Sequence, residues 1–202
     1  MKKPIIAVDI DDVLADSSEA LRREVNKMLG IDLQPKDYLV PGEYTGYYEQ
    51  VWLKHGLQGK ITLAEMYPRM KASQAHVLPH KHALNVLHEL RRHYELIIVS
   101  GRQHDWQVAT EDWILQHFPG IFTKVLLAGG EEGLQQKSKG QLCVENDVVW
   151  LIDDNVDHAL SAEELGVKVL VFGTYGWHHK MPPHMTKCKD WNAVLEYFNG
   201  QK

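Results

Sequence analysis

The chain has 202 residues, a formal net charge of −5 and two cysteines, Cys143 and Cys188, and this length predicts one compact domain with at most a modest insertion. The charge and the lack of a long basic run argue against binding to a nucleic acid polymer, and two cysteines suggest neither a disulfide framework nor a cysteine-based zinc site. Because no apolar run reaches the roughly 18 residues of a membrane span, we expect a cytoplasmic protein without a membrane partner.

The first predicted element is a buried strand that ends on acidic residues. The stretch from Ile5 to Val13 reads Ile-Ile-Ala-Val-Asp-Ile-Asp-Asp-Val, so an apolar run typical of a strand leads directly into Asp9, Asp11 and Asp12. Two carboxylates about 4 Å apart repel each other by roughly 4 kcal/mol at a near-surface effective dielectric constant. A Mg²⁺ ion would remove this repulsion and create a site for phosphate oxygens. A solvated turn between strand and helix is the alternative interpretation.

Residues 17–77 are predicted to form a small helical insertion, because they contain helical patterns and no convincing strand. Asp16 with Glu19 resembles a capping box at the start of a helix that Gly30 would end, and Thr62 with Glu65 resembles a second. The insertion also holds an aromatic cluster, which we interpret as its own hydrophobic core, with stacking on a nucleobase as the alternative. The cluster consists of Tyr44, Tyr47, Tyr48 and Trp52.

Helices and strands alternate regularly after Pro79. We expect strands at about 95–99, 124–128, 148–152 and 167–172, and helices at about 84–90, 106–114, 137–144, 156–165 and 190–198. This alternation predicts an α/β protein with a parallel sheet covered by helices on both faces. The predicted architecture is a Rossmann-like three-layer core of residues 1–16 and 78–202 that carries residues 17–77 as a cap after its first strand.

Polar residues follow several of the predicted strands, and in such folds ligands bind beyond the carboxyl ends of the strands. Carboxylates, a hydroxyl group and an ammonium group gathered at one sheet edge would suit phosphoryl transfer. Each piece alone has an ordinary explanation: a turn, a helix cap or a surface lysine. The pieces are Asp9-Ile10-Asp11 after the first strand, Ser100-Gly101-Arg102 after the second, Lys139, and Asp153-Asp154 after the fourth.

The order Asp-x-Asp-x-Val, strand-Ser, Lys, strand-Asp-Asp resembles the four motifs of the haloacid dehalogenase (HAD) superfamily. More narrowly, Asp9–Asp16 and the span from Lys139 through Cys143 to Asn155 are similar to the 5′-nucleotidase branch, which includes the 5′(3′)-deoxyribonucleotidases. The insertion resembles a cap of that superfamily. The resemblance implies a Mg²⁺-dependent phosphomonoesterase that hydrolyses nucleotides or other small phosphate esters through an aspartyl-phosphate.

The resemblance also implies a role for each matching residue. Asp9 would be the nucleophile that attacks phosphorus. Asp11 would be the general acid and base, which requires its pKa to be raised from the ordinary value of about 3.9. Ser100, the Gly101 amide and Lys139 would bind the phosphoryl group.

The same resemblance implies a metal site. Mg²⁺ would be held by Asp9, by the backbone carbonyl of Asp11 and by Asp153, and Asp154 would contribute through water. The sequence departs from the family at Asp12, since many relatives carry glycine there. This departure leaves the substrate open.

Several further polar residues are open to two interpretations. Lys137 is the rival of Lys139, and we prefer Lys139 for its spacing to Asp153. Arg102 would either meet a second anionic group or lie on the surface at a helix start. The segment Trp177-His178-His179 with His184 is interpreted as a polar loop, because its spacing fits no zinc pattern. The acidic pairs Glu131-Glu132 and Glu163-Glu164 are expected at the solvated surface.

Three other functions fit parts of the pattern. A phosphotransferase or phosphomutase would use the same aspartyl-phosphate. A non-catalytic phosphate-binding regulatory protein, such as a receiver domain, fits poorly, because the third strand ends in Ala128-Gly129-Gly130 and not in an acceptor aspartate. A metal-dependent nuclease would need a basic groove, of which the sequence shows no sign.

Overall fold

The computed structural model describes residues 2–130 and 136–201, so the acidic pair Glu131-Glu132 lies outside the described residues. Within the described part, six strands form one parallel sheet in the order β3-β2-β1-β4-β5-β6. The predicted α/β architecture with a parallel sheet is therefore confirmed. The strands are β1 (Ile5–Val8), β2 (Glu95–Gln103), β3 (Val125–Gly129), β4 (Val148–Asp153), β5 (Lys168–Phe172) and β6 (Thr186–Cys188).

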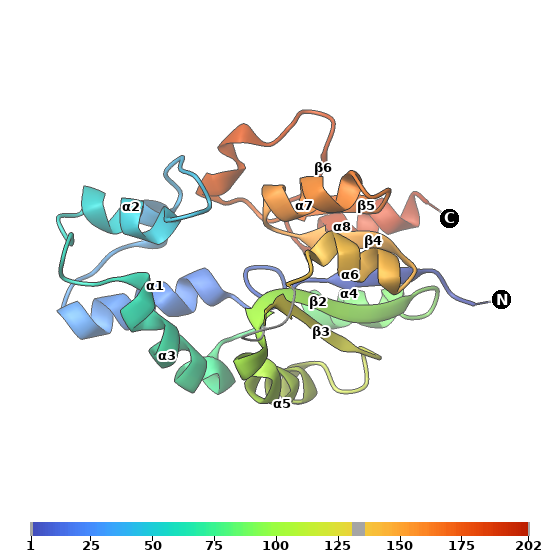
Figure 1. Ribbon diagram of the computed structural model, residues 1–202, viewed down its shortest axis with the longest axis horizontal. Helices are drawn as coiled ribbons and strands as arrows, with labels where there is room; N and C mark the ends of the chain where they lie inside the picture. Colours follow the sequence, from blue (N-terminus) through green and yellow to red (C-terminus); the bar gives the residue numbers. More distant parts are fainter. Residues whose placement is uncertain (1, 131–135, 202) are drawn as a thin grey trace.

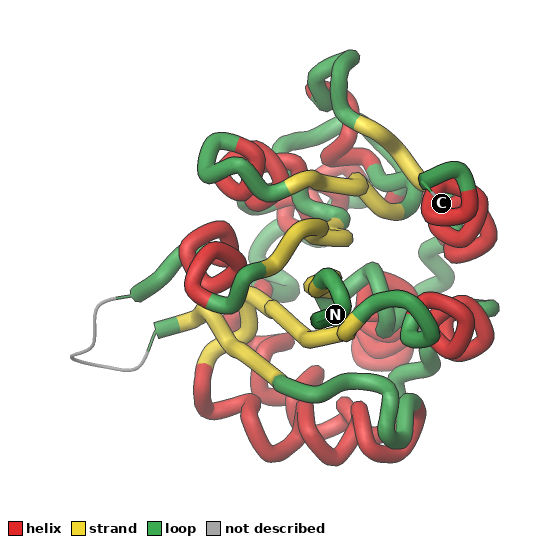
Figure 2. Tube along the Cα trace, turned by 90° about the vertical axis from the view of Figure 1, so that its right-hand side faces the viewer, coloured by secondary structure: helices red, strands yellow, loops and turns green. Residues whose placement is uncertain are grey.

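Helices cover both faces of this sheet, and three further helices lie together beyond one end of it (Figures 1 and 2). The helices of the sheet layers are α4 (Ala83–Leu90), α5 (Gln107–His117), α6 (Lys139–Glu145), α7 (Val156–Glu163) and α8 (Trp191–Asn199). The insertion contains α1 (Ser17–Leu29), α2 (Tyr47–Lys54) and α3 (Leu63–Ser73). Short 3₁₀ helices are η1 (Pro35–Tyr38), η2 (Gln74–His76), η3 (His104–Trp106) and η4 (Gly176–Lys180). None of the helices in the described ranges has the length and apolar character needed to cross a membrane.

Neighbouring residues of β1 pack against opposite layers of helices. Ile6 and Val8 belong to a hydrophobic cluster with residues of α4, α5 and α8. Ile5 and Ala7 belong to another cluster with residues of α6 and α7. Side chains of an extended strand alternate between its two faces, so a strand covered on both sides must be apolar throughout. This requirement explains the unbroken apolar run that precedes Asp9.

The insertion, called the cap below, has a hydrophobic core of its own. Leu21 and Val25 of α1 pack there with Trp52 of α2 and Met66 of α3. The same cluster includes Trp177, which comes from η4, far away in the sequence. The boundaries of the predicted domains remain a prediction, since the cap shares this core with a loop that follows β5.

The interpretation of Trp177-His178-His179 as a polar loop is wrong for its first two residues. Trp177 and His178 are buried, and the Trp177 ring stacks on Tyr175 with the ring centres 4.5 Å apart. Trp177 Nε1 donates a hydrogen bond to the backbone oxygen of Asp154 at 3.2 Å, and His178 Nε2 lies 2.6 Å from the same oxygen. These residues are buried although the sequence of the segment is polar. The hydrophobic periodicity of the sequence cannot reveal a contact with the cap, which is distant in the chain.

Local signals at helix starts were reliable in two cases and wrong in one. Thr62 and Glu65 form the predicted capping box of α3, and the Asp190 side chain accepts a hydrogen bond at the start of α8. Asp16 makes no side-chain cap for α1. Its expected partner Glu19 instead forms ion pairs with arginines of the next helical turn. Strand β6 was not predicted, because three residues carry too little periodic signal.

We predict that Gly176→Ala destabilises the protein by about 1–3 kcal/mol through overpacking. A Cβ atom at Gly176 would lie 2.0 Å from Tyr47 Oη and 2.0 Å from the backbone oxygen of Val40, both in the cap. The matched control is Gly200→Ala, whose Cβ would have no contact closer than 3.5 Å. Urea unfolding of both variants checks this prediction. Equal stability of the two variants would contradict the tight fit between η4 and the cap.

Candidate active site

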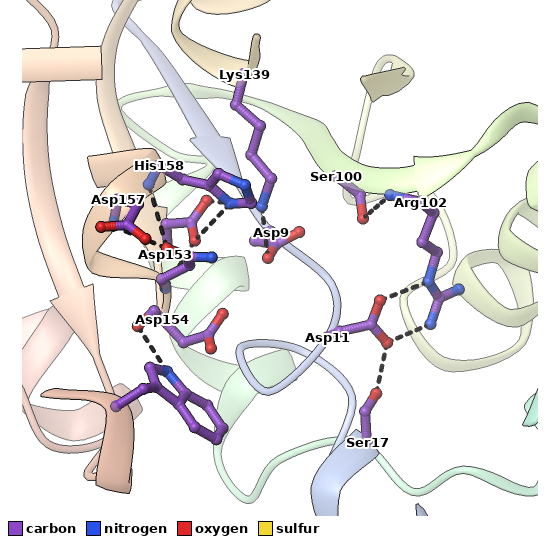
Figure 3. A network of polar contacts seen from close by, with 12 residues as sticks. Asp9, Asp11, Ser17, Ser100, Arg102, Lys139, Asp153, Asp154, Asp157 and His158 are labelled. Atoms are coloured by element: carbon purple, nitrogen blue, oxygen red, sulfur yellow. Dashed lines mark hydrogen bonds and ion pairs between the residues drawn. The ribbon is translucent and has the colours of Figure 1, made fainter. Parts of the chain in front are cut away.

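One buried lysine joins two buried aspartates at the carboxyl ends of the central strands. Lys139 Nζ lies 2.7 Å from Asp9 Oδ2 and 2.8 Å from Asp153 Oδ2 (Figure 3). Asp9 follows β1 directly and its N–H bonds to the backbone oxygen of Ile152 in β4. Asp153 ends β4, and Lys139 is the first residue of α6, which Ser138 caps. The structure thus brings together three residues that the sequence analysis selected.

The charges of this group are unbalanced, since the carboxylates outnumber the lysine. Burial raises the pKa of Asp9 to about 6, against the opposing charge of Lys139 and with added repulsion from Asp153. Burial also raises the pKa of Asp153, but Lys139 and His158 lower it more, so that its pKa lies at about 2. Burial and the neighbouring carboxylates raise the pKa of Asp154 well above its ordinary value. Lys139 alone therefore does not supply enough positive charge to balance these carboxylates.

The same acidic residues fit a divalent cation. Carboxylate oxygens of Asp9, Asp153 and Asp154 lie within 4.8 Å of one another, and all three residues are buried. Asp9 Oδ1 is a buried oxygen without a hydrogen-bond partner. Mg²⁺ prefers oxygen ligands, and an ion here would supply the charge that Lys139 alone does not. The contacts of Trp177 and His178 with its backbone oxygen hold Asp154 in place for this role.

The side chain of Asp11 does not join this acidic group. The metal-binding role of its backbone carbonyl stays a prediction. The Asp11 carboxylate forms a bidentate ion pair with Arg102, at 2.8 Å to Nε and 2.7 Å to Nη2 (Figure 3). Ser17 Oγ donates a further hydrogen bond to it at 2.6 Å. Arg102 is buried in β2 and also binds Thr110. The interpretation of Arg102 as a surface residue at a helix start is therefore wrong.

This ion pair also contradicts the expectation that the pKa of Asp11 is raised. Burial raises the pKa of Asp11, but the charge and hydrogen bonds of Arg102, with the bond from Ser17, lower it by more. The net pKa lies below its ordinary value, so the carboxylate is ionised in this structure. No local pattern could show this effect, because Arg102 lies 91 residues from Asp11 in the sequence.

The other predicted phosphate-binding residues line the same pocket. Ser100 is buried near the end of β2, and Gly101 follows it beside Lys139 and His158. The rival lysine, Lys137, forms an ion pair with Glu145 at 2.7 Å on the surface. Of the two lysines, it is Lys139 that contacts the acidic group.

The pocket has a volume of about 860 Å³ and lies between the sheet edge and the cap. Two members of the predicted aromatic cluster, Tyr47 and Trp52, are buried in the core of the cap, as the main interpretation expected. The other two, Tyr44 and Tyr48, line the pocket. Residues of α1, α3, η2, η3, α6 and α7 also line it.

Two residues near the site were not selected from the sequence. His158 lies in the first turn of α7, three residues after the capping residue Asn155. The Nδ1 atom of His158 lies 3.7 Å from Asp153 Oδ1. Gln74 lines the pocket from η2 and accepts a hydrogen bond from Arg102. His158 could have been found from its place on the first helical turn after Asp153. Gln74 carries no such signal.

Asp12 has a positive φ of 58° and is buried. Its carboxylate accepts hydrogen bonds from Ser18 N and Oγ, at 2.8 and 2.6 Å. Burial raises the pKa of Asp12 to about 7, against these hydrogen bonds. Aspartate tolerates the left-handed region better than most residues, which suits it to this turn.

We predict that Lys139→Met lowers the free energy of unfolding by about 3–5 kcal/mol in the presence of EDTA, because it leaves two buried carboxylates without their cation. Lys137→Met is the matched control and is expected to cost less than about 1 kcal/mol, since its ion pair is exposed. Chemical denaturation of both variants measures the difference. Equal costs would show that the bridge between Asp9 and Asp153 does not stabilise the fold.

Comparison with known proteins identifies the fold by structure alone, since neither a family model nor a curated protein matches the sequence. A haloacid dehalogenase-like protein of unknown function from Agrobacterium tumefaciens is 14% identical, with a TM-score of 0.66 over 98% of this chain and 99% of that one. A predicted phosphoglycolate phosphatase from Haemophilus somnus is 14% identical, with a TM-score of 0.65 over 98% of each chain. The Bacillus subtilis protein YfnB, solved bound to magnesium, is 14% identical, with a TM-score of 0.59 over 98% of this chain and 100% of that one. The chain therefore has the fold of the haloacid dehalogenase-like proteins.

Proposed function

We propose that the protein is a Mg²⁺-dependent phosphomonoesterase that acts through an aspartyl-phosphate on Asp9. The observation that carries this proposal is the bridge from Lys139 to Asp9 and Asp153 beside a pocket, with Asp9 Oδ1 left unpaired. Phosphoryl transfer depends mainly on positioning and on neutralising charge, and these residues provide both. The solved structures with the same fold include proteins described as phosphatases, which supports the proposal.

The residues of the site divide the proposed reaction among them. Lys139 holds the Asp9 carboxylate through Oδ2 and so orients it for the proposed attack on phosphorus. As the new P–O bond forms, the bond to the leaving oxygen breaks, and water later hydrolyses the aspartyl-phosphate. Ser100 Oγ and the Gly101 amide would hold phosphoryl oxygens. Mg²⁺ held by Asp9, Asp153 and Asp154 would neutralise charge on those oxygens.

Asp11 is the proposed acid and base, and its ion pair constrains both roles. The ionised carboxylate is ready to take a proton from the attacking water in the second step. Protonation of the leaving oxygen in the first step requires an uncharged Asp11, which Arg102 opposes. The acid role therefore requires the pair between Asp11 and Arg102 to loosen when the substrate binds.

The proposed substrate is a nucleotide or another small phosphate ester. A pocket of about 860 Å³ is within the range of about 300–1,000 Å³ that is usual for small-molecule sites. Phosphoglycolate is the natural comparison compound, because structural neighbours are described as phosphatases for it. Phosphate release from a set of phosphorylated metabolites, with Mg²⁺ or with EDTA, tests the proposal, and a competing alcohol reveals any phosphotransfer.

We predict that Asp9→Asn lowers turnover by at least about 10³-fold on every ester that the wild-type protein hydrolyses, because the nucleophile is lost. Circular dichroism should show an unchanged fold. The control is Asp112→Asn, an exposed position on α5, which should retain full turnover. Wild-type activity in the Asp9 variant would disprove the aspartyl-phosphate mechanism.

We also predict that Asp154→Asn weakens Mg²⁺ binding by about 10–100-fold in isothermal titration calorimetry, because a charged ligand at the site is lost. A second group of residues, Asp12, Asp16 and His80, has side-chain atoms within 4.8 Å of one another and is the competing location. Asp16→Asn is therefore the control and should leave the affinity unchanged. The reverse result would place the ion at the second group.

A further inference from the structure

We propose that Trp177 is a positioning residue that couples the cap to the Mg²⁺ site through the backbone of Asp154, so that metal binding and cap packing strengthen each other. This inference rests on the proposed function, of which it uses only the metal site. Trp177 lies in η4, in the segment between β5 and β6 that reaches the cap (Figure 1). Its side chain is buried in the core of the cap, and its indole N–H bonds to the residue that follows β4.

On the cap side, several aromatic side chains pack around the ring of Trp177. Tyr47 and Tyr44 meet it edge to face, with ring centres 4.9 and 5.5 Å away. Tyr48 lies in a similar orientation with its ring centre 6.5 Å away. Aromatic rings at these distances and angles attract each other in addition to burying apolar area. Since Tyr44 and Tyr48 also line the pocket, Trp177 supports part of the pocket wall.

On the sheet side, Trp177 provides one of two hydrogen bonds that fix the backbone of Asp154. Trp177 Nε1 lies 3.2 Å and His178 Nε2 lies 2.6 Å from the Asp154 backbone oxygen, and both must donate, because a carbonyl oxygen can only accept. The carboxylate of the same residue lies within 4.8 Å of those of Asp9 and Asp153. A tilt of the Asp154 peptide group would therefore move its carboxylate away from the other two. Metal affinity is sensitive to such outer-shell contacts.

The segment that carries Trp177 is attached to the cap by further contacts, which do not involve the tryptophan ring. The backbone N–H of Gly42 donates a hydrogen bond to the backbone oxygen of Gly176 at 3.3 Å. Gly176 lies so close to the cap that a Cβ atom there would be 2.0 Å from Tyr47 Oη. Helix η4 therefore follows any displacement of this part of the cap, and the hydrogen bond of Trp177 transmits that displacement to Asp154.

Coupling of this kind acts in both directions. A cap packed around Trp177 holds the backbone of Asp154 in the position that suits a metal ion. A metal ion bound at the Asp154 carboxylate in turn holds Trp177 in the core of the cap. Because coupling between two sites is reciprocal, each event strengthens the other by the same factor. Loss of the metal would therefore loosen the cap as well as the acidic group.

The test compares two tryptophans of the same hydrophobic core. Trp177→Phe keeps an aromatic ring in the cap and removes the N–H that binds Asp154. Trp52→Phe is the matched control, because Trp52 is buried in the same core and its Nε1 atom donates instead to Tyr38 Oη at 2.9 Å. Isothermal titration calorimetry measures Mg²⁺ affinity for the wild-type protein, both variants and Asp154→Asn. Hydrogen–deuterium exchange with and without Mg²⁺ measures the protection of α2 in the cap, with α4 of the sheet layers as the reference.

We expect Trp177→Phe to weaken Mg²⁺ binding about tenfold, at the lower end of the effect of losing an outer-shell contact, and Trp52→Phe to leave the affinity unchanged. In the wild-type protein, saturating Mg²⁺ should slow amide exchange in α2 by up to the same factor, and by more than in α4, because the coupling is reciprocal. This protection of α2 should be absent from Trp177→Phe. The wild-type measurement does not depend on the folding of any variant.

Equal Mg²⁺ affinities of the wild-type protein and Trp177→Phe would overturn the inference, as would equal losses in the two tryptophan variants or exchange in α2 that does not respond to Mg²⁺. If any of these results accompanies weakened binding in Asp154→Asn, the proposed metal site stands and the inference alone fails. A wild-type protein that binds no Mg²⁺, or binding that Asp154→Asn leaves unchanged, would overturn the proposed metal site and the inference with it.

Discussion

The contact on which the site depends is the bridge from Lys139 to Asp9 and Asp153, since two carboxylates could not share this buried position without a cation between them. The sheet order makes the bridge possible. Strand β1 lies between β2 and β4, so Asp9 has Ser100 on one side and Asp153 on the other. The chain runs from β1 through β2 to β3 and then crosses back to β4 on the other side of β1, and such a reversal of strand order creates the kind of crevice where ligands bind in α/β folds. One central strand thus brings together groups that are far apart in the chain.

Much of the fold could be predicted because its signals are local. The apolar run before Asp9 and the alternation of strands and helices after Pro79 indicated a parallel sheet, and the polar residues at strand ends marked the edge where the pocket lies. Strand β6 was missed because three residues show no period. The failure at Asp16 has a physical counterpart, because the Glu19 carboxylate is bound by two arginines three and four residues further along the helix and does not close a capping box.

The site itself was predicted less completely, because its electrostatics depend on contacts between distant residues. The sequence placed Asp11 beside Asp9 but could not show that its carboxylate points to Arg102. The sequence also gave no sign that Gln74, in the cap, would bind the same arginine. A motif identifies which residues are present, whereas a pKa depends on every charge within a few ångströms. The expected pKa shift of Asp11 therefore had the wrong sign.

The burial of Trp177 in the core of the cap has a consequence for biosynthesis. Residues 17–77 emerge from the ribosome well before Trp177 has been translated, so their hydrophobic cluster stays incomplete during most of synthesis. The hydrophobic core of the cap is therefore completed only after the carboxyl-terminal third of the polypeptide has been synthesised. Because Trp177 also binds the backbone of Asp154, the same late event finishes the acidic end of β4. A truncated chain that stops before this tryptophan would lack both a residue of the cap core and the hydrogen bond to the backbone of Asp154.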